Sequence, residues 1–532
     1  MSAAAGGVRR LRVGVYNRFW RTAGGGEKFA GGIAQALAGR HDVELMGHDD
    51  VDASRLSALA DRLQLDLSGV GWRTVGRSPT EIEAASADYE LFINVSYGSV
   101  LRNRAPHGLY VVHFPTIGAP PPSGWRRFLL RSVGRSAKIT GASLDVGRWT
   151  GGVYTAEPLG PLTHRWTDGD GVLQLTSVRT VRLVLSRLTA AGGVPVSVQA
   201  RTADGPIVGS TTVRPPAGRR GLPVSLLTAR LPEPGPGAGG SVLHVVCPTR
   251  LPGGRASDQR RLGASVVAVL GGPWYQQLLQ LVEQPLRVGA ADLSFLDSYQ
   301  QVVSNSAFTA RWVRQLWGVD SDILNPPVSA QPQGDKEPVI LHVGRFFSPE
   351  AGHSKRQLEL VRAFRELVGR GAAQGWTLHL VGGCDEEGRA YLDQVRAEIG
   401  DLPVVLHVNA AAAELRALFA RAAIYWHATG LGLDPDAHPE RMEHFGIATV
   451  EAMSAGAVPV AIGVAGQLEV FDDAVEGFHF HDLDGLVARS AELIADPVRR
   501  QAMSEAALQR AERYGEAAFE RRMQSLADDL AG

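Results

Sequence analysis

The chain has 532 residues, of which 44% are hydrophobic and 20% charged, and its formal net charge is -1. This length exceeds what one hydrophobic core supports, so we expect about two to four domains. The near-zero charge argues against a nucleic-acid-binding protein, because such proteins usually carry a basic excess.

The two cysteines, Cys247 and Cys384, lie far apart in the sequence. They form neither a disulfide framework nor a zinc-site pattern, which fits a reducing cytoplasm. Residues 1–17 lack the apolar run of a signal peptide, and no later stretch approaches the roughly 20 apolar residues of a membrane span. We therefore expect a cytoplasmic protein, peripheral at most to the inner face of the plasma membrane.

Residues 11–115 alternate between strand-like and helix-like segments. A helical pattern over 25–39 follows the first strand-like segment. Strands are predicted at 11–17, 42–47, 88–96 and 108–114. Alternation of this kind predicts a parallel sheet covered by helices on both faces.

Residues 124–138 are basic and contain no acidic residue. The cations are Arg126, Arg127, Arg131, Arg135 and Lys138. A helix would align those at every fourth position on one face, with Trp125, Phe128, Leu129 and Val133 on the other. This pattern predicts contact with an anionic membrane. The alternative is a solvated helix packed on its own domain.

Residues 147–272 are made of short β-prone runs separated by Gly, Pro and Asp-Gly turns. The pattern is typical of an all-β sandwich or jelly roll. We therefore predict an inserted β domain, whose aromatic residues Trp149, Tyr154 and Trp166 either stack on a glycan or pack in the core.

After Tyr299 the α/β alternation returns more regularly. Near-continuous apolar runs predict further parallel strands, covered by helices on both faces. These runs are 301–306, 339–344, 377–383, 403–409, 423–429 and 458–463. Residues 497–530 have a charged, helical pattern.

The segment EHFGIATVEAMSAGAVPVA, which begins at Glu443, carries two carboxylates eight residues apart, Glu443 and Glu451. The helix start near Phe445 and Gly446 offers backbone N–H groups to an oxygen-rich ligand. A carboxylate is the natural acceptor for pairs of sugar hydroxyls. Ordinary surface glutamates are the alternative explanation.

A second pair of polar residues follows the predicted strand 339–344. Arg345 stands just beyond this strand, and Lys355 stands at the start of the next helix. Ligands of open α/β sheets bind at the carboxyl ends of the strands. A guanidinium and an ammonium at that edge suit a diphosphate, although each residue alone could be an ordinary surface cation.

Together these segments resemble the retaining GT-B glycosyltransferases of the large "glycosyl transferases group 1" family, which includes bacterial mannosyltransferases and sucrose synthases. The matching pieces are GGGEKFA, VVHFP, SNSAFTARWVRQLWGVDSDILNPPV, VGRF with a following Lys, and EHFGIATVEAMSAGAVPV. The SNSAFTARWV to NPPV segment is most similar to eukaryotic-type α-mannosyltransferases that extend lipid-linked oligosaccharides. The chain departs from the family in a longer gap between Arg345 and Lys355, and in VAGQLEV in place of a GGxxE turn.

The resemblance implies roles for individual residues. Arg345 and Lys355 would hold the donor diphosphate, and Glu451 would bind the ribose hydroxyls. His113 would lie beside the reacting sugar, whose hydroxyls Glu443 would bind. The implied donor-binding positions are Gly25, Gly26, Gly344, His444, Phe445, Gly446, Ile447 and Glu451.

The implied reaction is hexose transfer from a nucleotide-diphosphate sugar, such as GDP-mannose or a UDP-sugar, to a glycan, lipid-linked or small-molecule acceptor. Retention at the anomeric carbon is implied, with no metal and no cofactor besides the co-substrate. The rivals are a phosphorylase or epimerase of the same fold, and a non-catalytic glycan-binding scaffold. Nucleic acid is not an expected partner.

The predicted fold is therefore α/β, with two Rossmann-like lobes and an inserted all-β domain. The N-terminal lobe is predicted at 8–146, followed by the insert at 147–272 and a return segment at 273–300. The C-terminal lobe is predicted at 301–512, and a final helix at 513–532 is expected to cross back to the N-terminal lobe.

Overall fold

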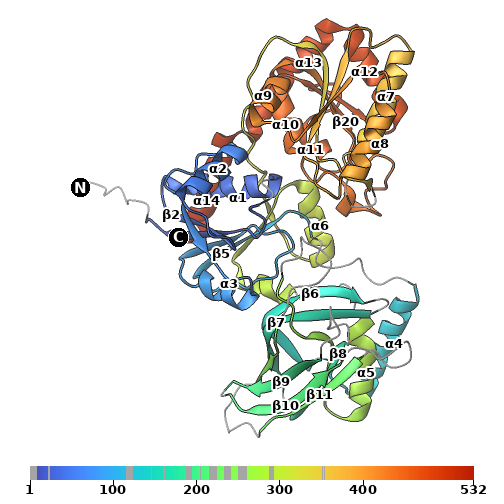
Figure 1. Cartoon of the computed structure of the whole chain (residues 1–532). Coiled ribbons are helices and arrows are strands. Elements are labelled where there is room, and N and C mark those ends of the chain that lie inside the picture. Colours follow the sequence, from blue (N-terminus) through green and yellow to red (C-terminus); the bar gives the residue numbers. More distant parts are fainter. Residues whose placement is uncertain are drawn as a thin grey trace, which may run out of the picture.

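The computed structural model contains two parallel sheets and one antiparallel sheet, connected and covered by helices (Figure 1). It describes residues 9–531 except 22–23, 116–123, 145, 160–161, 177, 187–194, 204, 215–223, 233–240, 250–259, 287–292, 350–351 and 353. Within this described part of the chain, no helix is both long enough and apolar enough to span a bilayer.

The first lobe is built on a seven-stranded parallel sheet of order β15-β14-β5-β4-β1-β2-β3. Its strands are β1 (Arg12–Tyr16), β2 (Asp42–Gly47), β3 (Gly71–Thr74), β4 (Leu91–Asn94), β5 (His107–Val112), β14 (Gln301–Ser304) and β15 (Asp322–Ile323). Its helices are α1 (Gly25–Ala38), α2 (Ala53–Leu63), α3 (Pro79–Ser86), α6 (Ala307–Trp317) and α14 (Glu516–Ala531), with a 3-10 turn, η1, at Leu293–Ser298. The parallel sheet predicted for residues 11–115 is confirmed, with β3 as an additional strand.

Local sequence signals explain where the helices of this lobe begin. Ser78 and Glu81 form a capping box at α3, with Pro79 at its first position, which satisfies backbone donors that the helix leaves open. Ser306 is the N-cap of α6, and its hydroxyl accepts from Thr309 N. The last helix, α14, returns from the second lobe and places Met523 in one core with α1 and β1.

The inserted strands form one antiparallel sheet of order β10-β9-β12-β7-β13-β8-β11, with β6 paired to β7. They are β6 (Gly147–Leu159), β7 (Leu162–Leu175), β8 (Thr180–Ser186), β9 (Val196–Thr202), β10 (Ile207–Val213), β11 (Val224–Arg230), β12 (Val242–Val246) and β13 (Ser265–Gly271). The outer strands approach each other closely, since a Cβ on Gly209 of β10 would lie 2.3 Å from the Thr228 carbonyl oxygen of β11. The sheet is therefore nearly closed on itself, unlike the two facing sheets of the predicted sandwich or jelly roll. Alternation along strands marks an inner face but does not tell one curled sheet from two.

Two helices accompany the antiparallel sheet, α4 (Gly124–Thr140) and α5 (Trp274–Leu286). They pack on each other, and α5 also packs on β13 (Figure 1). We therefore propose that the inserted unit runs from α4 to α5, beyond the predicted limits of 147–272. Tyr154 is buried there and donates its hydroxyl to the Arg261 carbonyl oxygen at 3.1 Å, so this ring does not serve as an exposed sugar platform.

The second lobe has a six-stranded parallel sheet of order β18-β17-β16-β19-β20-β21. Its strands are β16 (Glu337–Val343), β17 (Thr377–Gly382), β18 (Val404–Val408), β19 (Ala422–His427), β20 (Val458–Ile462) and β21 (Phe478–Phe480). Its helices are α7 (Gln357–Gly369), α8 (Arg389–Ile399), α9 (Ala412–Arg421), α10 (Ile447–Ser454), α11 (Gln467–Val470), α12 (Leu483–Ala495) and α13 (Pro497–Ala511), with 3-10 turns η3 (Pro439–Arg441) and η4 (Glu512–Tyr514).

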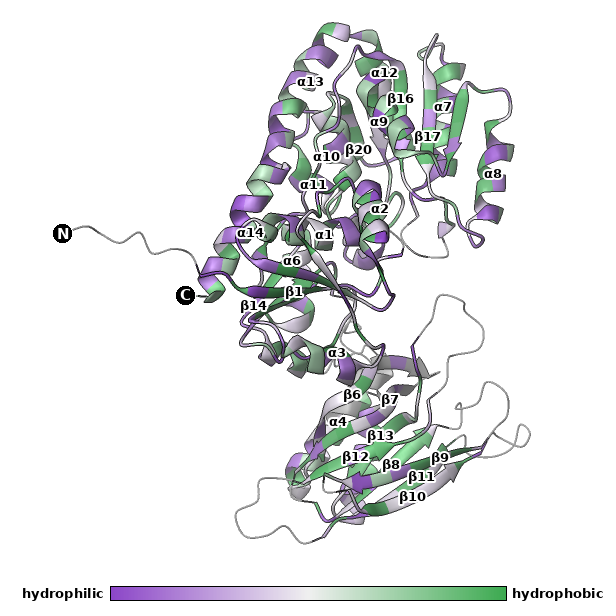
Figure 2. Ribbon diagram, turned by 60° about the vertical axis from the view of Figure 1, so that its left-hand side comes forward, coloured by the Kyte–Doolittle hydropathy of each residue, from purple (hydrophilic) through white to green (hydrophobic). Residues whose placement is uncertain are grey.

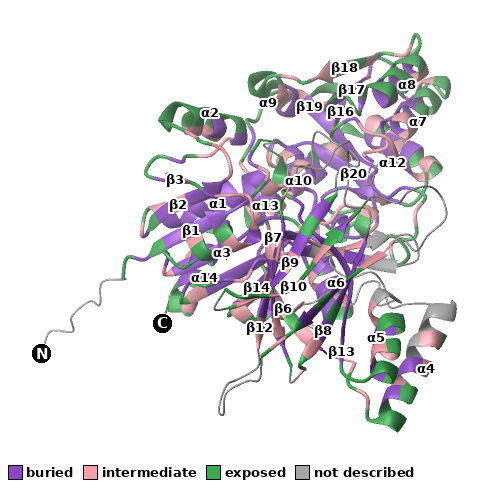
Figure 3. Ribbon diagram, turned by 60° about the horizontal axis from the view of Figure 1, so that its bottom comes forward, coloured by how far each residue is buried: buried purple, intermediate pink, exposed green. Residues whose placement is uncertain are grey.

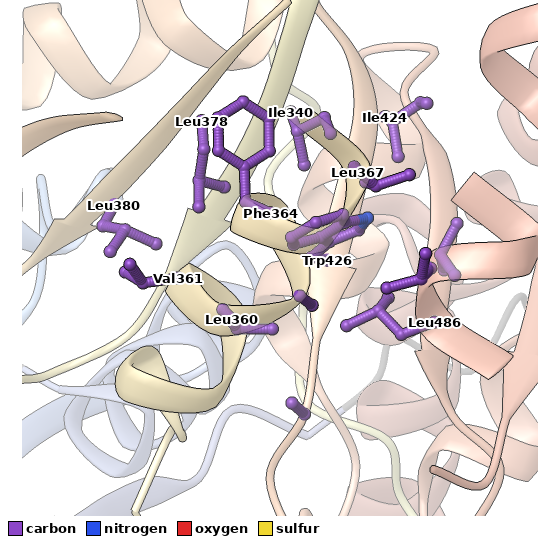
Figure 4. Close-up of a cluster of buried hydrophobic side chains, with 14 of the residues drawn as sticks. Ile340, Leu360, Val361, Phe364, Leu367, Leu378, Leu380, Ile424, Trp426 and Leu486 are labelled. Carbon is purple, nitrogen blue, oxygen red and sulfur yellow. The ribbon is translucent and has the colours of Figure 1, made fainter. Parts of the chain in front are cut away.

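The core of the second lobe lies between this sheet and its helices. Phe364 of α7 and Trp426 of β19 meet edge to face at 6.3 Å between ring centroids (Figure 4). The Trp426 indole donates to Ser490 of α12 at 2.9 Å, so its polar atom is satisfied inside the core. The hydropathy colouring agrees with this layering. Apolar residues fill the central strands, whereas the covering helices carry both apolar and hydrophilic residues (Figure 2).

The predicted start of the C-terminal lobe at residue 301 is wrong. Strand β14 pairs with β5, and β15 pairs with β14, so both belong to the first sheet. The second sheet begins only at β16. The apolar run 301–306 marks a buried parallel strand correctly, but such a run does not say which of two parallel sheets it joins.

Candidate active site

Lys355 and Glu443 form an ion pair in the second lobe. Lys355 lies just before α7, and Glu443 lies in the loop before α10. Both side chains are largely shielded, with 17% and 18% of their surface exposed. His427, at the end of β19, places Nε2 3.3 Å from the same carboxylate. The carboxyl ends of the strands therefore gather a cation, a carboxylate and an imidazole at one edge of the sheet.

Gly344 makes room for the Lys355 side chain. A Cβ on Gly344 would lie 2.5 Å from Lys355 Cγ, closer than real contacts allow. His342, two residues earlier, is buried, and burial together with the nearby Lys355 charge lowers its pKa to about 4. Its Nδ1 lies 2.9 Å from the Trp426 carbonyl oxygen, so His342 is a neutral donor beside the ion pair at neutral pH.

Arg356 is separated from this cluster. It begins α7 in the left-handed region, at φ 61°, and its guanidinium binds Glu359 at 3.1 Å on its own helix. Of the two adjacent cations, Lys355 is therefore the one that contacts Glu443.

Arg345 does not contact Lys355 in this structure. Its guanidinium binds Asp385 at 2.7 Å, with 61% of the Arg345 side chain exposed. The backbone beneath it is held firmly, because the Gln357 amide donates to the carbonyl oxygens of Gly344 and Arg345 at 3.1 Å each. Arg345 is thus an exposed cation on an anchored loop at the same sheet edge.

The start of α10 depends on Gly446, which precedes the helix at φ 106°. A side chain there would be strained, and its Cβ would lie 2.0 Å from the Gln467 amide nitrogen. Gln467 is fully buried and binds the Phe445 carbonyl oxygen at 3.3 Å and the Thr449 hydroxyl at 3.0 Å. These bonds hold the loop that carries Glu443 and His444 against the helix.

Residues of the first lobe reach this region directly. Lys28 of α1 places Nζ 2.7 Å from Glu451 Oε1 of α10. A Cβ on Gly25 would lie 3.3 Å from Ile447, and the ring of Phe114 stacks on His444 at 4.2 Å. The start of α1, the segment after β5 and the start of α10 therefore meet between the lobes.

His113 lies on the first-lobe side of this junction. Its Nε2 is 2.7 Å from the Val95 carbonyl oxygen, and a Cβ on Gly26 would lie 3.6 Å from its ring. Burial lowers the pKa of His113. The neutral ring therefore donates from Nε2, which makes Nδ1 its acceptor atom.

Glu469 joins the lobes at a second point. Its carboxylate accepts from the backbone nitrogens of Ala307 and Phe308 at 2.7 and 2.6 Å, so a second-lobe residue caps the first turn of α6. Burial raises the pKa of Glu469, while the two N–H donors oppose that shift.

The predicted site residues thus fall into two groups. The structure joins Lys355 to Glu443, Gly25 to Ile447 and Gly26 to His113, while Arg345 stays apart on Asp385. Sequence reasoning missed the contacting residues Lys28, His427 and Phe114. Lys28 and Phe114 lie inside the matching pieces GGGEKFA and VVHFP, and His427 lies in the predicted strand 423–429, but only tertiary structure shows their contacts. Among the described residues, no group of three or more His, Cys, Asp or Glu side chains is arranged to hold a metal ion.

Comparison with known proteins agrees with this geometry. Residues 329–510, which contain the Lys355–Glu443 pair and α10, match the family described as "Glycosyl transferases group 1". These residues are a group 1 glycosyltransferase domain. The crystal structure of a glycosyltransferase from Rickettsia africae superposes with a TM-score of 0.50 at 10% identity, covering 98% of this chain and 99% of that one. The two-lobed fold is therefore shared with that protein.

Two curated relatives are GDP-Man:Man(3)GlcNAc(2)-PP-Dol alpha-1,2-mannosyltransferases. The mouse protein is 31% identical over 213 residues, 37% of this chain and 39% of its own length. The human protein is 28% identical over 212 residues, 37% of this chain and 40% of its own length. The chain thus spans about two fifths of the length of these relatives.

Proposed function

We propose that the chain is a retaining, metal-independent glycosyltransferase that moves a hexose from a nucleotide-diphosphate sugar to a glycan, lipid-linked or small-molecule acceptor. The observation that carries the proposal is the Lys355–Glu443 pair beside the start of α10, inside the group 1 glycosyltransferase domain. GDP-mannose is the proposed donor and a lipid-linked glycan the proposed acceptor, because the curated relatives are GDP-mannose enzymes with a lipid-linked acceptor.

In this mechanism, Lys355 leaves Glu443 and binds the donor diphosphate together with Arg345. The bond between the anomeric carbon and the diphosphate oxygen breaks, and a bond from the acceptor oxygen forms on the same face of the sugar. The diphosphate takes the acceptor proton as it leaves. Fixed positive charge at the leaving group is commonly the largest single catalytic contribution in such sites.

The carboxylates supply recognition. Glu443 would accept from hydroxyl groups of the donor sugar once Lys355 has turned to the phosphates, and Glu451 would accept from the ribose hydroxyls. His113 would contact the sugar from the first lobe. The backbone from His444 to Ile447 offers N–H groups at the start of α10.

Thermal unfolding with UDP-, GDP-, ADP- and dTDP-sugars tests the donor class. A ligand at about 100 times its dissociation constant stabilises the native state by roughly 2.7 kcal/mol, which shifts the midpoint visibly. We expect a shift with GDP-mannose, followed by transfer to a lipid-linked acceptor with retained anomeric configuration. A folded protein that responds to none of these sugars would instead be the non-catalytic glycan-binding scaffold.

A further inference from the structure

Helix α5 presents its apolar face to solvent. Five of its apolar residues are exposed, and Trp274 keeps 73% of its surface accessible. They are Trp274, Tyr275, Leu278, Leu281 and Val282. Their spacing places them along a single stripe of the helix. Most surface helices show the reverse arrangement, so this orientation needs a cause.

The cause lies on the opposite face of α5. Strand β13 pairs with β7 only at Ser265 and Val266, so its later backbone groups need other partners on that side. Gln284 binds both N and O of Val269, at 2.8 and 2.7 Å. Gln280 accepts from Gly271 N at 2.9 Å, and Gln276 donates to Gly271 O at 3.2 Å. These glutamines satisfy the strand as another strand would, so the polar face of α5 must point inward.

Helix α4 continues the apolar surface beside α5. Phe128 is 70% exposed and Ile139 is 85% exposed, whereas Val133 and Ala137 are buried. This observation departs from the sequence expectation, which placed Phe128 and Val133 on the same face. The side chains of Trp125, Arg126, Arg127 and Arg131 lie outside the described residues.

The surface of α4 and α5 also has a uniform charge. Arg135 and Lys138 are exposed on α4, which contains no acidic residue. Arg182 of β8 donates to Gln277 of α5 at 2.7 Å and adds a third cation beside the helix. The one acidic residue of α5, Glu283, is buried. Both helices lie along one flank of the insert, beside its antiparallel sheet (Figures 1 and 3).

We propose that this α4–α5 surface docks the protein on an anionic lipid bilayer. Trp and Tyr favour the boundary between lipid headgroups and acyl chains, and an apolar stripe flanked by cations is the pattern of interfacial helices. A second copy of the chain fits less well, because a self-complementary interface would bring cations together, with no exposed acidic residue on α4 or α5 to pair them. The docking does not depend on which sugar the lobes transfer.

Vesicle flotation of the full chain tests this docking. We expect binding to phosphatidylcholine vesicles that contain phosphatidylglycerol, weaker binding to phosphatidylcholine alone, and loss of binding at high salt. The double variant Trp274→Ser/Leu278→Ser should lower vesicle affinity at least about tenfold. The double variant Arg135→Gln/Lys138→Gln should lower it by a similar factor on anionic vesicles only.

Matched controls lie on the second lobe. Val498→Ser removes an apolar side chain that is 79% exposed on α13, and Arg389→Gln/Arg396→Gln removes two exposed cations of α8. Both controls should float like the parent chain. Absence of flotation, or flotation that the α4 and α5 variants leave unchanged, would overturn the proposal. A dimer in sedimentation velocity that Trp274→Ser/Leu278→Ser dissociates, without vesicle binding, would assign the surface to a second copy.

Discussion

Lys28 Nζ lies 2.7 Å from Glu451 Oε1, and this ion pair joins α1 of the first lobe to α10 of the second. Only 10% and 13% of the two side chains are exposed. Removing one partner of such a shielded pair leaves the other charge uncompensated, at a cost of about 3 kcal/mol or more when burial is complete. The pair therefore links the two lobes. Its carboxylate, Glu451, is also the group that we propose binds the ribose hydroxyls.

We predict that Lys28→Met lowers the free energy of unfolding by about 2–3 kcal/mol in the absence of donor. The double variant Lys28→Met/Glu451→Gln should lose less free energy of unfolding than the sum of the two single variants, because it leaves no unpaired charge. Denaturant unfolding of the parent chain, Lys28→Met, Glu451→Gln and the double variant measures the coupling energy between the two side chains. Additive losses would show that the pair contributes nothing to stability.

The second prediction concerns the diphosphate. Arg345→Ala and Lys355→Ala should each lower turnover by about 100-fold, as expected for loss of a preorganised electrostatic group. Arg356→Gln is the matched control, because its guanidinium binds Glu359 and not Glu443. Initial rates at saturating donor measure the effect. Turnover within threefold of the parent chain for Arg345→Ala would remove Arg345 from this role.

A third prediction follows from the contact between Gly344 and Lys355. The Cβ of Gly344→Ala would displace Lys355 Cγ, which lies 2.5 Å from that position, so turnover should fall about tenfold or more. Gly369→Ala is the control, because a Cβ there meets nothing within 4 Å. Rates and melting temperatures of the two variants, measured together, separate loss of positioning from general destabilisation. Equal turnover of Gly344→Ala and Gly369→Ala would show that a Cβ at residue 344 does not displace Lys355.

The fourth prediction concerns pH. The pKa of His342 is lowered to about 4 by burial, from an unfolded value near 6.5. The unfolded chain therefore binds the proton first, so His342 destabilises the fold as pH falls from about 6.5 towards 4. Between pH 7 and pH 5 this contribution amounts to about 2 kcal/mol.

The variant His342→Asn tests this linkage, because its amide can still donate to the Trp426 carbonyl oxygen but does not titrate. The loss of stability between pH 7 and pH 5 should shrink by about 2 kcal/mol relative to the parent chain. Chemical denaturation at the two pH values is the measurement. An unchanged difference would show that other groups control acid sensitivity in this range.

Much of the fold was predictable because buried parallel strands are continuous apolar runs, as in β1, β16 and β20. Strands β3 and β21 escaped prediction because they are short, and β3 is only partly buried. The run at β14 was recognised as a strand, but its sheet was not. The orientation of α5 was also beyond prediction, because it depends on backbone groups of β13 that lack a second strand.

In the candidate site too, some residues could be recognised from the sequence and others could not. Glu443, Glu451 and Lys355 stand out in the sequence because their neighbours, Gly446 and the end of β16, mark a helix start and a strand end. Their partners Lys28 and His427 do not stand out, since an ion pair between distant segments leaves no local pattern. Sequence therefore identified the groups that carry charge, and the structure identified which charges meet.

The pairing of β5 with β14 also bears on how the protein is made. These neighbours in one sheet are separated in the chain by the whole inserted unit, and α14 joins the same lobe only after the second lobe has been synthesised. On the ribosome, the antiparallel domain and the second lobe can each fold as they emerge, whereas the first lobe must wait for its last helix. Of the three units, the first lobe is thus begun first and completed last, and its partial sheet stays exposed during synthesis of the other two.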